Sequence, residues 1–388
     1  SSNGLEKRPK LRFPGFDEPW RAAQLGDLLI ELSDYATQES GFPLLTSSRQ
    51  GLFVQEDYKQ ANAETTVFSV LPYGCITYRH MSDDNIFHFN INRLVANGLV
   101  SKEYPVFTVR KEVLDTDFLV DTLNSSPLFS VFCIQQKKGG TRTRLYFKTL
   151  CSYQMFLPVL HEQQVIASFI RLLDKRIERQ MELVETLKKY KRGVLSVAFG
   201  KYGSICSRET TQYPFSVLAS RRSEKYDPRS GEQMPCVELE HIEQETGRII
   251  GSIPSTQQNS IKSVCKSGDT LFGKLRPYLR KYAFVKEDMV CSSEIWSLVP
   301  SETIIPEYLF YLVQTDEFIK IANISSGTKM PRAEWSNIEK SVFSVPSKEV
   351  QAQIVQTLRG LDSRILDAID LLDELQFLKR GLMQQLFI

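Results

Sequence analysis

One stretch of the chain occurs twice, and this duplication constrains the fold more than any other feature of the 388 residues. A shift of 188 residues lays 158–199 on 346–387 without a gap, and 14 of the 42 positions are identical. Each copy begins at a proline, which suits the first turn of a helix, and contains no further proline. The duplication predicts two long helices in equivalent positions.

Apolar residues recur at heptad spacing in both copies, so each predicted helix carries one apolar stripe. A helix of about 37 residues rises on the order of 55 Å, and another helix must cover its stripe. The other copy is the first candidate, in an antiparallel pair because the intervening segment must return the chain; a helix from another subunit is the alternative. Gln180 and Ala368, near the middle of the two stripes, mark a thinner patch in the packing. Lys191 and Lys379 lie toward the helix C-termini, where a long stem can reach water.

The segments before and between the predicted helices are of domain size and read as mixed α/β. Apolar helical runs open at Phe118 and Tyr308, and the 188-residue shift also aligns Gly139 with Gly327 and Arg144 with Arg332. Each copy of the duplication is therefore a globular domain followed by its long helix. We therefore predict an α/β (α+β) protein, in which two mixed α/β domains are separated by two long antiparallel helices that form a coiled-coil-like spacer with an internal pseudo-two-fold repeat. The predicted parts are domain 1 (1–155), the first helix (156–200), domain 2 (201–345) and the second helix (346–388), with strands near 66–70, 75–78, 105–109, 269–272, 283–285 and 295–299.

Composition limits the class of protein. With 48 basic and 46 acidic residues the net charge is +2, a weak signal for nucleic-acid binding. No apolar run approaches the roughly 20 residues of a membrane span, and no signal-like apolar core opens the sequence, so we expect a soluble, cytoplasmic protein. The seven cysteines form no Cys-x-x-Cys and the four histidines are far apart, so we expect reduced core cysteines, no metal site and no cofactor.

Motifs of the common enzyme classes are missing from the sequence. It contains no Gly-x-x-x-x-Gly-Lys-Ser/Thr loop, no His-Glu-x-x-His and no Gly-x-Ser-x-Gly. The Asn/Asp-Pro-Pro-aromatic tetrapeptide of adenine methyltransferases is missing as well. We therefore expect no catalytic residues in this chain.

An ordered set of short motifs accompanies the duplication. It comprises Pro-Lys-Leu-Arg-Phe-Pro-Gly-Phe at 9–16 with Trp20 and Leu-Gly-Asp-Leu at 25–28, Leu-Pro-Val-Leu-His-Glu-Gln-Gln-Val-Ile at 157–166, and Leu-Lys-Arg-Gly-Leu-Met-Gln-Gln-Leu-Phe at 378–387. Over its whole length the chain resembles the specificity subunits of type I restriction-modification systems. One departure is the start of the second helix, where 345–351 spaces its Glu and Gln differently.

The resemblance implies two target-recognition domains held apart by an antiparallel helix pair. It implies double-stranded DNA as the ligand and two methyltransferase (modification) subunits as partners, with restriction (translocase/endonuclease) subunits added to that core. Methylation and cleavage would then belong to the other subunits. An isolated specificity subunit could also associate with itself through its docking surfaces.

Candidate DNA contacts are loops that combine Arg or Lys with Ser, Thr or an aromatic residue. A basic turn taken alone is usually a solvated surface turn that binds no ligand. However, two glycine-broken basic loops, 137–144 and 325–332, occupy equivalent places in the two copies, which favours a shared role. Arg192, Arg221 and Arg222 are expected to be surface or helix-end charges. The candidates are Ser47, Ser48, Arg49, Tyr78, Arg79, His80, Lys137, Lys138, Thr141, Arg142 and Arg144 in the first domain, and Lys274, Arg276, Tyr278, Arg280, Lys281, Thr328, Lys329 and Arg332 in the second.

Two functions compete at this point. In the first, each domain reads one half of a bipartite, asymmetric DNA site, and the helix pair sets the distance between the halves. In the second, the chain is a two-headed protein-binding scaffold with a helical dimerisation spacer, which the near-neutral charge favours. DNA binding that weakens with salt and keeps a sequence preference in competitor DNA would distinguish the first function from the second.

Overall fold

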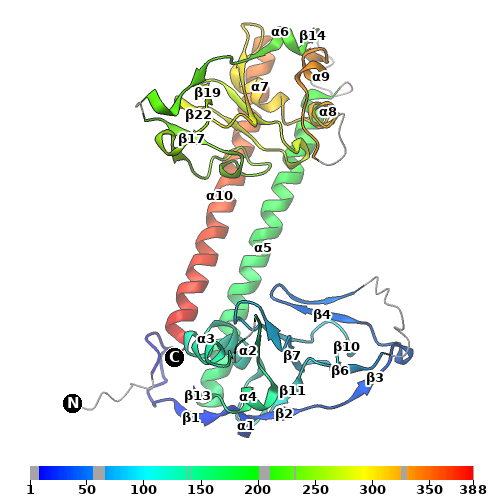
Figure 1. Ribbon diagram of the computed structural model, residues 1–388, viewed down its shortest axis with the longest axis vertical. Helices are drawn as coiled ribbons and strands as arrows, with labels where there is room; N and C mark the ends of the chain where they lie inside the picture. The colour runs from blue at the N-terminus through cyan, green and yellow to red at the C-terminus, as the bar shows by residue number, and fades with distance from the viewer. Residues whose placement is uncertain are drawn as a thin grey trace, which may run out of the picture. The chain divides into compact units, whose positions relative to one another are not determined.

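The computed structural model describes residues 8–55, 66–137, 139, 141–200, 210–230, 233–324 and 330–387. It divides the chain into two compact units (Figure 1). Unit 1 consists of Ser1–Glu178 and Asp373–Ile388, and unit 2 of Arg179–Leu372. Each unit therefore contains part of both long helices, α5 (Leu160–Phe199) and α10 (Lys348–Leu386). The two predicted long helices are confirmed.

Unit 1 is built on an antiparallel sheet of order β2-β11-β7-β9, with a second sheet of order β10-β6-β3. Helices α2, α3 and α4 bury aromatic and aliphatic side chains against the first sheet. The elements that precede α5 are β1 (Arg21–Gln24), α1 (Leu25–Leu28), β2 (Leu29–Glu31), β3 (Tyr35–Ala36), η1 (Gln38–Ser40), β4 (Leu45–Ser48), β5 (Gly51–Val54), β6 (Phe68–Pro72), β7 (Ile76–Tyr78), β8 (Met81–Ser82), β9 (Phe89–Ile91), β10 (Asn97–Ser101), β11 (Val106–Val109), α2 (Thr116–Ser125), α3 (Pro127–Gln135), β12 (Thr143–Arg144), α4 (Phe147–Cys151) and β13 (Gln154–Leu157).

Unit 2 repeats this plan with a sheet of order β15-β23-β20-β21. Its second sheet is larger, of order β16-β19-β22-β17-β18, and includes one parallel pair, β17 with β22. The elements between the long helices are β14 (Thr211–Pro214), α6 (Phe215–Leu218), β15 (Ala219–Arg221), β16 (Lys225–Tyr226), η3 (Pro228–Ser230), β17 (Pro235–Val237), η4 (Leu239–His241), β18 (Ile253–Pro254), η5 (Ser255–Gln257), β19 (Lys262–Cys265), β20 (Thr270–Gly273), η6 (Pro277–Leu279), β21 (Tyr282–Phe284), β22 (Met289–Cys291), β23 (Ile295–Pro300), α7 (Pro306–Leu312), α8 (Asp316–Ala322), α9 (Trp335–Glu339) and β24 (Val342–Val345).

The mixed α/β prediction is confirmed, as are the six predicted strands and the two predicted short helices. The strands β6, β7, β11, β20, β21 and β23 begin and end within two residues of the predicted runs. Helices α2 and α7 contain Phe118 and Tyr308, which are buried in the cores of their units. The runs could be recognised because strands with both faces covered are almost uniformly apolar.

The long helices are antiparallel, as their contacts within unit 2 show. Gln180 Nε2 donates to the carbonyl of Ala368 at 2.8 Å, and Lys191 forms an ion pair with Asp362. Residue numbers thus rise along α5 as they fall along α10. Gln180 and Ala368 are equivalent positions of the duplication, so the pseudo-two-fold axis of the helix pair passes between them. The expected thin patch at Gln180 is instead closed by a buried amide.

Lys191 departs from the expectation that its stem reaches water. Its side chain is only 4% exposed, pairs with Asp362 and lies 5.5 Å from the centre of the Tyr311 ring. Burial lowers the pKa of Lys191, and the charge of Asp362 opposes that change. The equivalent Lys379 of unit 1 is 30% exposed and pairs with Asp174, the equivalent of Asp362. The duplication therefore preserves the ion pair but not its burial.

A buried glutamine fastens the start of each long helix to the domain that precedes it. Gln163 accepts the N–H of Asp115 at 2.8 Å, and Gln351 accepts that of Ile305 at 2.8 Å. Each amide also donates to the carbonyl of the proline two residues before its helix. Buried amides with all partners satisfied hold their helices in one orientation.

The last turn of each long helix enters the unit built from the other copy. In unit 1, Phe387 of α10 lies 5.6 Å from Phe118. In unit 2, Phe199 of α5 lies 4.7 Å from Tyr308. Each phenylalanine is buried in the core of its unit. The C-terminus of each helix is thus a structural part of the opposite domain.

The described residues include free cysteines but neither a group that could hold a metal ion nor a helix that could span a membrane. Six cysteines are free, five of them buried and Cys151 partly so, while Cys206 lies outside the described residues. No described group of three His, Cys, Asp or Glu side chains could hold a metal ion. Within the described ranges, no helix is long and apolar enough to cross a bilayer.

Candidate nucleic-acid interface

A groove of about 680 Å³ lies on unit 1, which we call the unit 1 groove. Residues 46–50 of the β4–β5 hairpin form one wall, residues between 79 and 88 form the other, and Tyr104 completes the lining. The hairpin is antiparallel, with Ser48 opposite Gly51, so its turn projects Arg49 and Gln50. The predicted contacts Ser47, Ser48 and Arg49 of the hairpin therefore line this groove.

One ion pair joins the two walls of the unit 1 groove, and another joins a wall to the predicted basic loop. Arg49 pairs with Asp84, and Arg142 Nε lies 2.7 Å from Asp83. The hydrogen bond from Arg49, followed by that from Ser82 at 2.8 Å, lowers the pKa of Asp84. The groove therefore presents fixed charges of both signs at neutral pH.

Most predicted contacts of unit 1 are on the surface. Arg49, Arg79, Lys137, Thr141, Arg142 and Arg144 are exposed, and Lys138 lies outside the described residues. Arg144 pairs with Met81 across β12 and β8, so the basic loop runs beside the groove wall. Ser47 is buried, and its hydroxyl accepts from Asn90, which also donates to the carbonyl of Ser48. Ser47 therefore supports the hairpin from below.

The prediction is wrong for Tyr78 and His80. Tyr78 is fully buried, and its hydroxyl donates to the carbonyl of Leu145 at 3.0 Å. His80 is only 5% exposed, stacks on Tyr146, and has its pKa lowered by burial. Alternate residues of an extended segment face opposite sides, so Arg79 points outward where its two neighbours point inward. Strand β7 (Ile76–Tyr78) is buried at all three positions, so alternation along this strand could not have excluded Tyr78.

In unit 2 the structure brings two predicted loops together. The N–H of Arg276 donates to the carbonyl of Pro331 at 2.8 Å, and the N–H of Ala333 to that of Lys274 at 2.8 Å. Arg332 is exposed and pairs with Glu294 at 2.9 Å. Arg276 and Tyr278 are exposed, whereas Thr328 and Lys329 lie outside the described residues.

Arg280 and Lys281 require a correction, because both are engaged inside unit 2. Arg280 pairs with Asp316, donates to the carbonyl of Gln314 at 3.1 Å, and is 16% exposed. Lys281 Nζ donates to the carbonyl of Leu239 at 2.6 Å. The basic run in the sequence did not reveal that its last two cations turn toward the protein.

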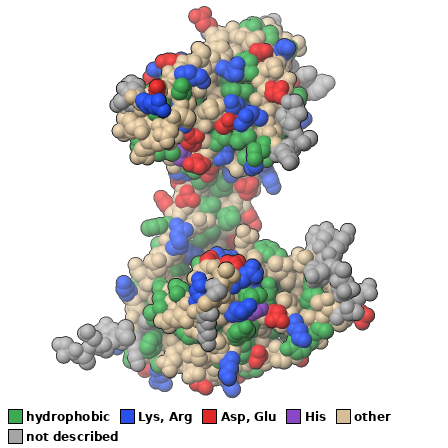
Figure 2. All heavy atoms as spheres, in the orientation of Figure 1, with side chains coloured by type: hydrophobic (Ala, Val, Ile, Leu, Met, Phe, Trp, Pro, Cys, Tyr) green, Lys and Arg blue, Asp and Glu red, His purple; other side chains and the backbone are tan. Residues whose placement is uncertain are grey.

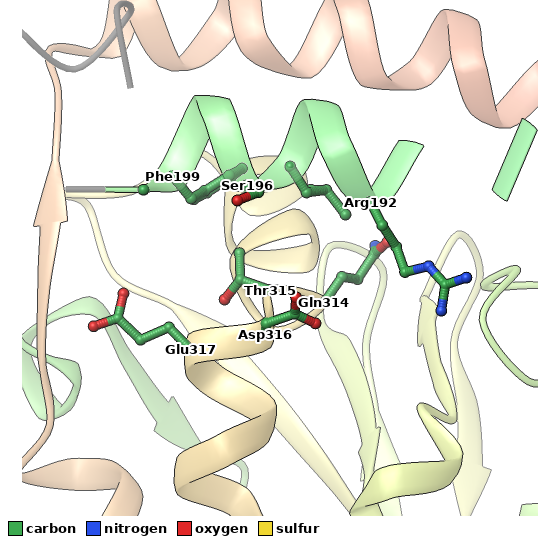
Figure 3. Close-up of a pocket in the computed structure, with 9 residues that line it drawn as sticks. Arg192, Ser196, Phe199, Gln314, Thr315, Asp316 and Glu317 are labelled. Atoms are coloured by element: carbon green, nitrogen blue, oxygen red, sulfur yellow. The ribbon is translucent and has the colours of Figure 1, made fainter. Parts of the chain in front are cut away.

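The turn that Arg280 holds also forms a small cavity of about 80 Å³ at the end of α5. Figure 3 shows Ser196 and Phe199 on the side of α5 that faces the turn from Gln314 to Glu317. The hydroxyl of Thr315 accepts the N–H of Phe318 and begins α8. The cavity lies where the C-terminus of α5 packs against the rest of unit 2, so we assign it a structural role.

A second groove, of about 560 Å³, lies on unit 2, and sequence reasoning missed it. Its walls carry Arg221, Arg222, Lys225 and Lys274 together with Trp335. Only Lys274 was among the candidates. Arg222 is not a surface charge: it forms two hydrogen bonds of 2.6 and 2.7 Å to the buried Asp269. No local pattern links Arg221 to a tryptophan more than 100 residues away, so the groove could not be read from the sequence.

Charge on the molecular surface is mixed. In Figure 2 the Lys and Arg side chains of each unit lie among Asp and Glu side chains on the face shown. This agrees with the net charge of +2. Any contact with an anion must therefore depend on local clusters.

Two curated relatives resemble parts of this sequence. The type I restriction enzyme HindI specificity subunit of Haemophilus influenzae is 33% identical over 112 residues, which cover 27% of this chain and 24% of that protein. The match thus spans about a quarter of the relative's length. The type I restriction enzyme MjaVIII specificity subunit of Methanocaldococcus jannaschii is 23% identical over 299 residues, which cover 70% of this chain and 69% of that protein.

Two solved structures share the fold. One comes from a study of complex assembly and conformational transition of the type I R-M system, with a TM-score of 0.57 and 13% identity over 97% of this chain and 99% of that chain. The other is the type I restriction-modification S subunit from M. genitalium, with a TM-score of 0.55 and 15% identity over 98% of this chain and 99% of that chain.

The family comparison covers both copies of the duplication. Residues 96–188 and 222–375 match the family described as the type I restriction modification DNA specificity domain. Together these two matches take in well over half of the chain. The chain therefore belongs to the type I restriction-modification DNA specificity family.

Proposed function

We propose that this chain is the DNA sequence-specificity subunit of a type I restriction-modification complex, in which each unit reads one half of a bipartite, asymmetric site. The observation that carries the proposal is the presence of two specificity-domain matches, 96–188 and 222–375, one in each copy of the duplication. The recognition residues are the exposed candidates that border the unit 1 groove and the Lys274–Arg276 segment. The two sets differ in sequence and position, so the two half-sites differ as well.

The long helices would set the distance between the half-sites. An α5 of 40 residues rises about 60 Å, compared with about 34 Å for one turn of DNA. After allowance for the width of two domains, this length suits two major-groove contacts about one turn apart. Domains 1–155 and 201–345 would be the readers, and 156–200 and 346–388 the spacer.

The proposed partners are two methyltransferase subunits, with restriction subunits added to that core. Exposed apolar residues at equivalent positions of the two long helices support the proposal of two similar docking surfaces. Leu183 on α5 and Leu371 on α10 are both exposed, as are Tyr190 and Leu378. Partly exposed apolar residues seven positions apart on one helix face are typical of a surface that binds a partner. Methylation and cleavage are assigned to those partners, and this chain acts in the cytoplasm without catalysis.

Lengthening the spacer is expected to widen the recognised DNA site. One added heptad in each long helix, beside Gln180 and Ala368, preserves the apolar stripe and adds about 10 Å, or roughly three base pairs. Mapping of methylated sites in cells should return the same half-sites with a gap longer by about that amount. As a control, exposed residues of the helices beside Gln180 and Ala368 are substituted without any insertion. An unchanged gap in the lengthened variant contradicts the ruler.

The rival function is a two-headed protein-binding scaffold, and the near-neutral charge is its support. It predicts weak DNA binding with no preference among sequences. A pool of random duplexes presented to the full chain with its methyltransferase partner distinguishes the two. Enrichment of one bipartite motif supports the specificity subunit, whereas an unselected pool supports the scaffold.

A further inference from the structure

We propose that the groove of unit 2 between β15 and α9 is an anion site that holds phosphates of the DNA backbone, with Arg221 as its principal anchor. The inference rests on the proposed function, since it takes the ligand to be DNA. It adds a site that the basic loops of the sequence did not indicate. We call it the phosphate groove, defined by Arg221, Lys225, Lys274 and the serine side chains around them.

Charge is the first support. Among the described residues that line the phosphate groove, none is acidic, four are basic and six are serines. Arg222 is neutralised by the buried Asp269 behind the wall, which also accepts from Ser297. Arg221, Lys225 and Lys274 form no ion pair with any described carboxylate. Three cations and a set of hydroxyl donors therefore remain for an anion, the combination that binds DNA phosphates.

Rigidity is the second support. The guanidinium carbon of Arg221 lies 4.8 Å from the centre of the Trp335 ring, a cation–π arrangement that fixes the side chain while leaving its N–H edge accessible. Lys225 Nζ donates to Ser263 Oγ at 3.1 Å. Both cations stand on strands, β15 and β16. The groove is thus organised before a ligand arrives, which reduces the entropy lost on binding.

The duplication supplies an internal comparison. Strand β2 of unit 1 corresponds to β15: each has three residues, follows a four-residue helix, and shows one buried position followed by two exposed positions. Glu31 ends β2 where Arg221 ends β15. Phe147 begins α4 where Trp335 begins α9. The equivalent position of unit 1 thus carries the opposite charge, so the shared fold plan does not itself demand a cation there.

A phosphate anchor and a base reader differ in their response to substitution. Loss of a phosphate contact weakens binding to all sequences alike and lowers the salt dependence by about one cation per residue removed. Loss of a base contact relaxes the preference at one position. Three separate cations and the groove serines other than Ser297, whose hydroxyl already donates to Asp269, match the first description, because they offer many single donors to an anion.

Arg221→Glu tests the inference, because it installs the residue that unit 1 tolerates. With the full chain and a mixed-sequence duplex of about 40 base pairs, we expect at least a tenfold weaker Kd at low salt and a log–log salt slope smaller by about one. Arg221→Lys should retain most of the affinity. Arg221→Glu combined with Glu287→Arg keeps the net charge and should remain as weak as the single variant, because Glu287 is exposed and outside the groove.

Each result of this binding experiment either supports or contradicts the phosphate groove. Equal affinity and slope for wild type and Arg221→Glu, with both chains folded, overturn the phosphate groove and leave the proposed function standing. Recovery of affinity in the charge-compensated variant overturns it too, since only overall charge would then matter. A wild-type chain that binds no duplex at any salt concentration overturns both. A change confined to one base pair of a cognate site replaces the anchor with a base reader.

Discussion

Replacement of Lys191 by alanine is expected to lower the free energy of unfolding by about 3–5 kcal/mol. The ammonium is buried in the helix pair of unit 2 and compensates the charge of Asp362, which also accepts a hydrogen bond from Tyr311 at 2.8 Å. Its removal leaves the carboxylate with one neutral donor in a largely dry site. Chemical denaturation of the full chain, monitored by a spectroscopic probe in unit 2, measures the decrease in the free energy of unfolding.

The duplication provides the matched control for this prediction. Lys379→Ala removes the equivalent cation in unit 1, where the side chain is 30% exposed and Asp174 is 39% exposed. Water can replace the lost partner there, so the expected loss is below about 1 kcal/mol. Equal losses for the two variants would contradict the assignment of the Lys191 pair as buried and structurally essential.

Asp121→Asn is expected to stabilise unit 1 above neutral pH and to have little effect at pH 4. Burial in α2 raises the pKa of Asp121 to about 7. The carboxylates of Asp174, Asp117 and Asp115 raise it further, and Lys379 opposes them. Between about pH 4 and pH 7 the folded state therefore holds a proton that the unfolded state has released. The contribution of Asp121 to the free energy of unfolding is therefore fully present below about pH 4 and is lost as the pH rises from about 4 through 7.

At pH 8 the ionised Asp121 costs the folded state roughly 4 kcal/mol, and asparagine removes that cost. The free energy of unfolding of wild type and variant, measured at pH 4 and pH 8, should differ by about 2–4 kcal/mol only at pH 8. Tyr311 occupies the equivalent position in unit 2. Tyr311→Phe should lose about 1 kcal/mol at both pH values, because its pKa is raised well above this range. A constant difference for Asp121→Asn would refute the explanation.

Long-range periodicity made the helices predictable. Two copies with a shared stripe implied α5, α10 and their antiparallel pairing. Compact apolar runs implied six strands, among them β7 and β11 of the central sheet of unit 1 and β20, β21 and β23 of that of unit 2. Burial of Lys191 was not predictable, since it depends on Tyr311, a side chain of the domain that closes over the helix. Sequence spacing gives the face of a helix, whereas the covering partner decides which polar residues on that face lose contact with water.

The interface was harder to predict than the fold. The exposed Thr141, Arg142 and Arg144 were identified from the composition of their segment, but Tyr78 and His80 are buried in unit 1. The pair of Arg221 and Trp335 joins two elements that are distant in the chain. Composition identifies cations, while the fold determines which of them are neutralised and which remain free to meet an anion.

Genome-wide mapping of methylated adenines tests the central claim most directly. Cells that carry this chain with its cognate methyltransferase are compared with cells that lack this chain alone. The specificity function predicts a bipartite, asymmetric motif that disappears with the chain. An unchanged set of methylated sites, with the methyltransferase shown to be active, would contradict it.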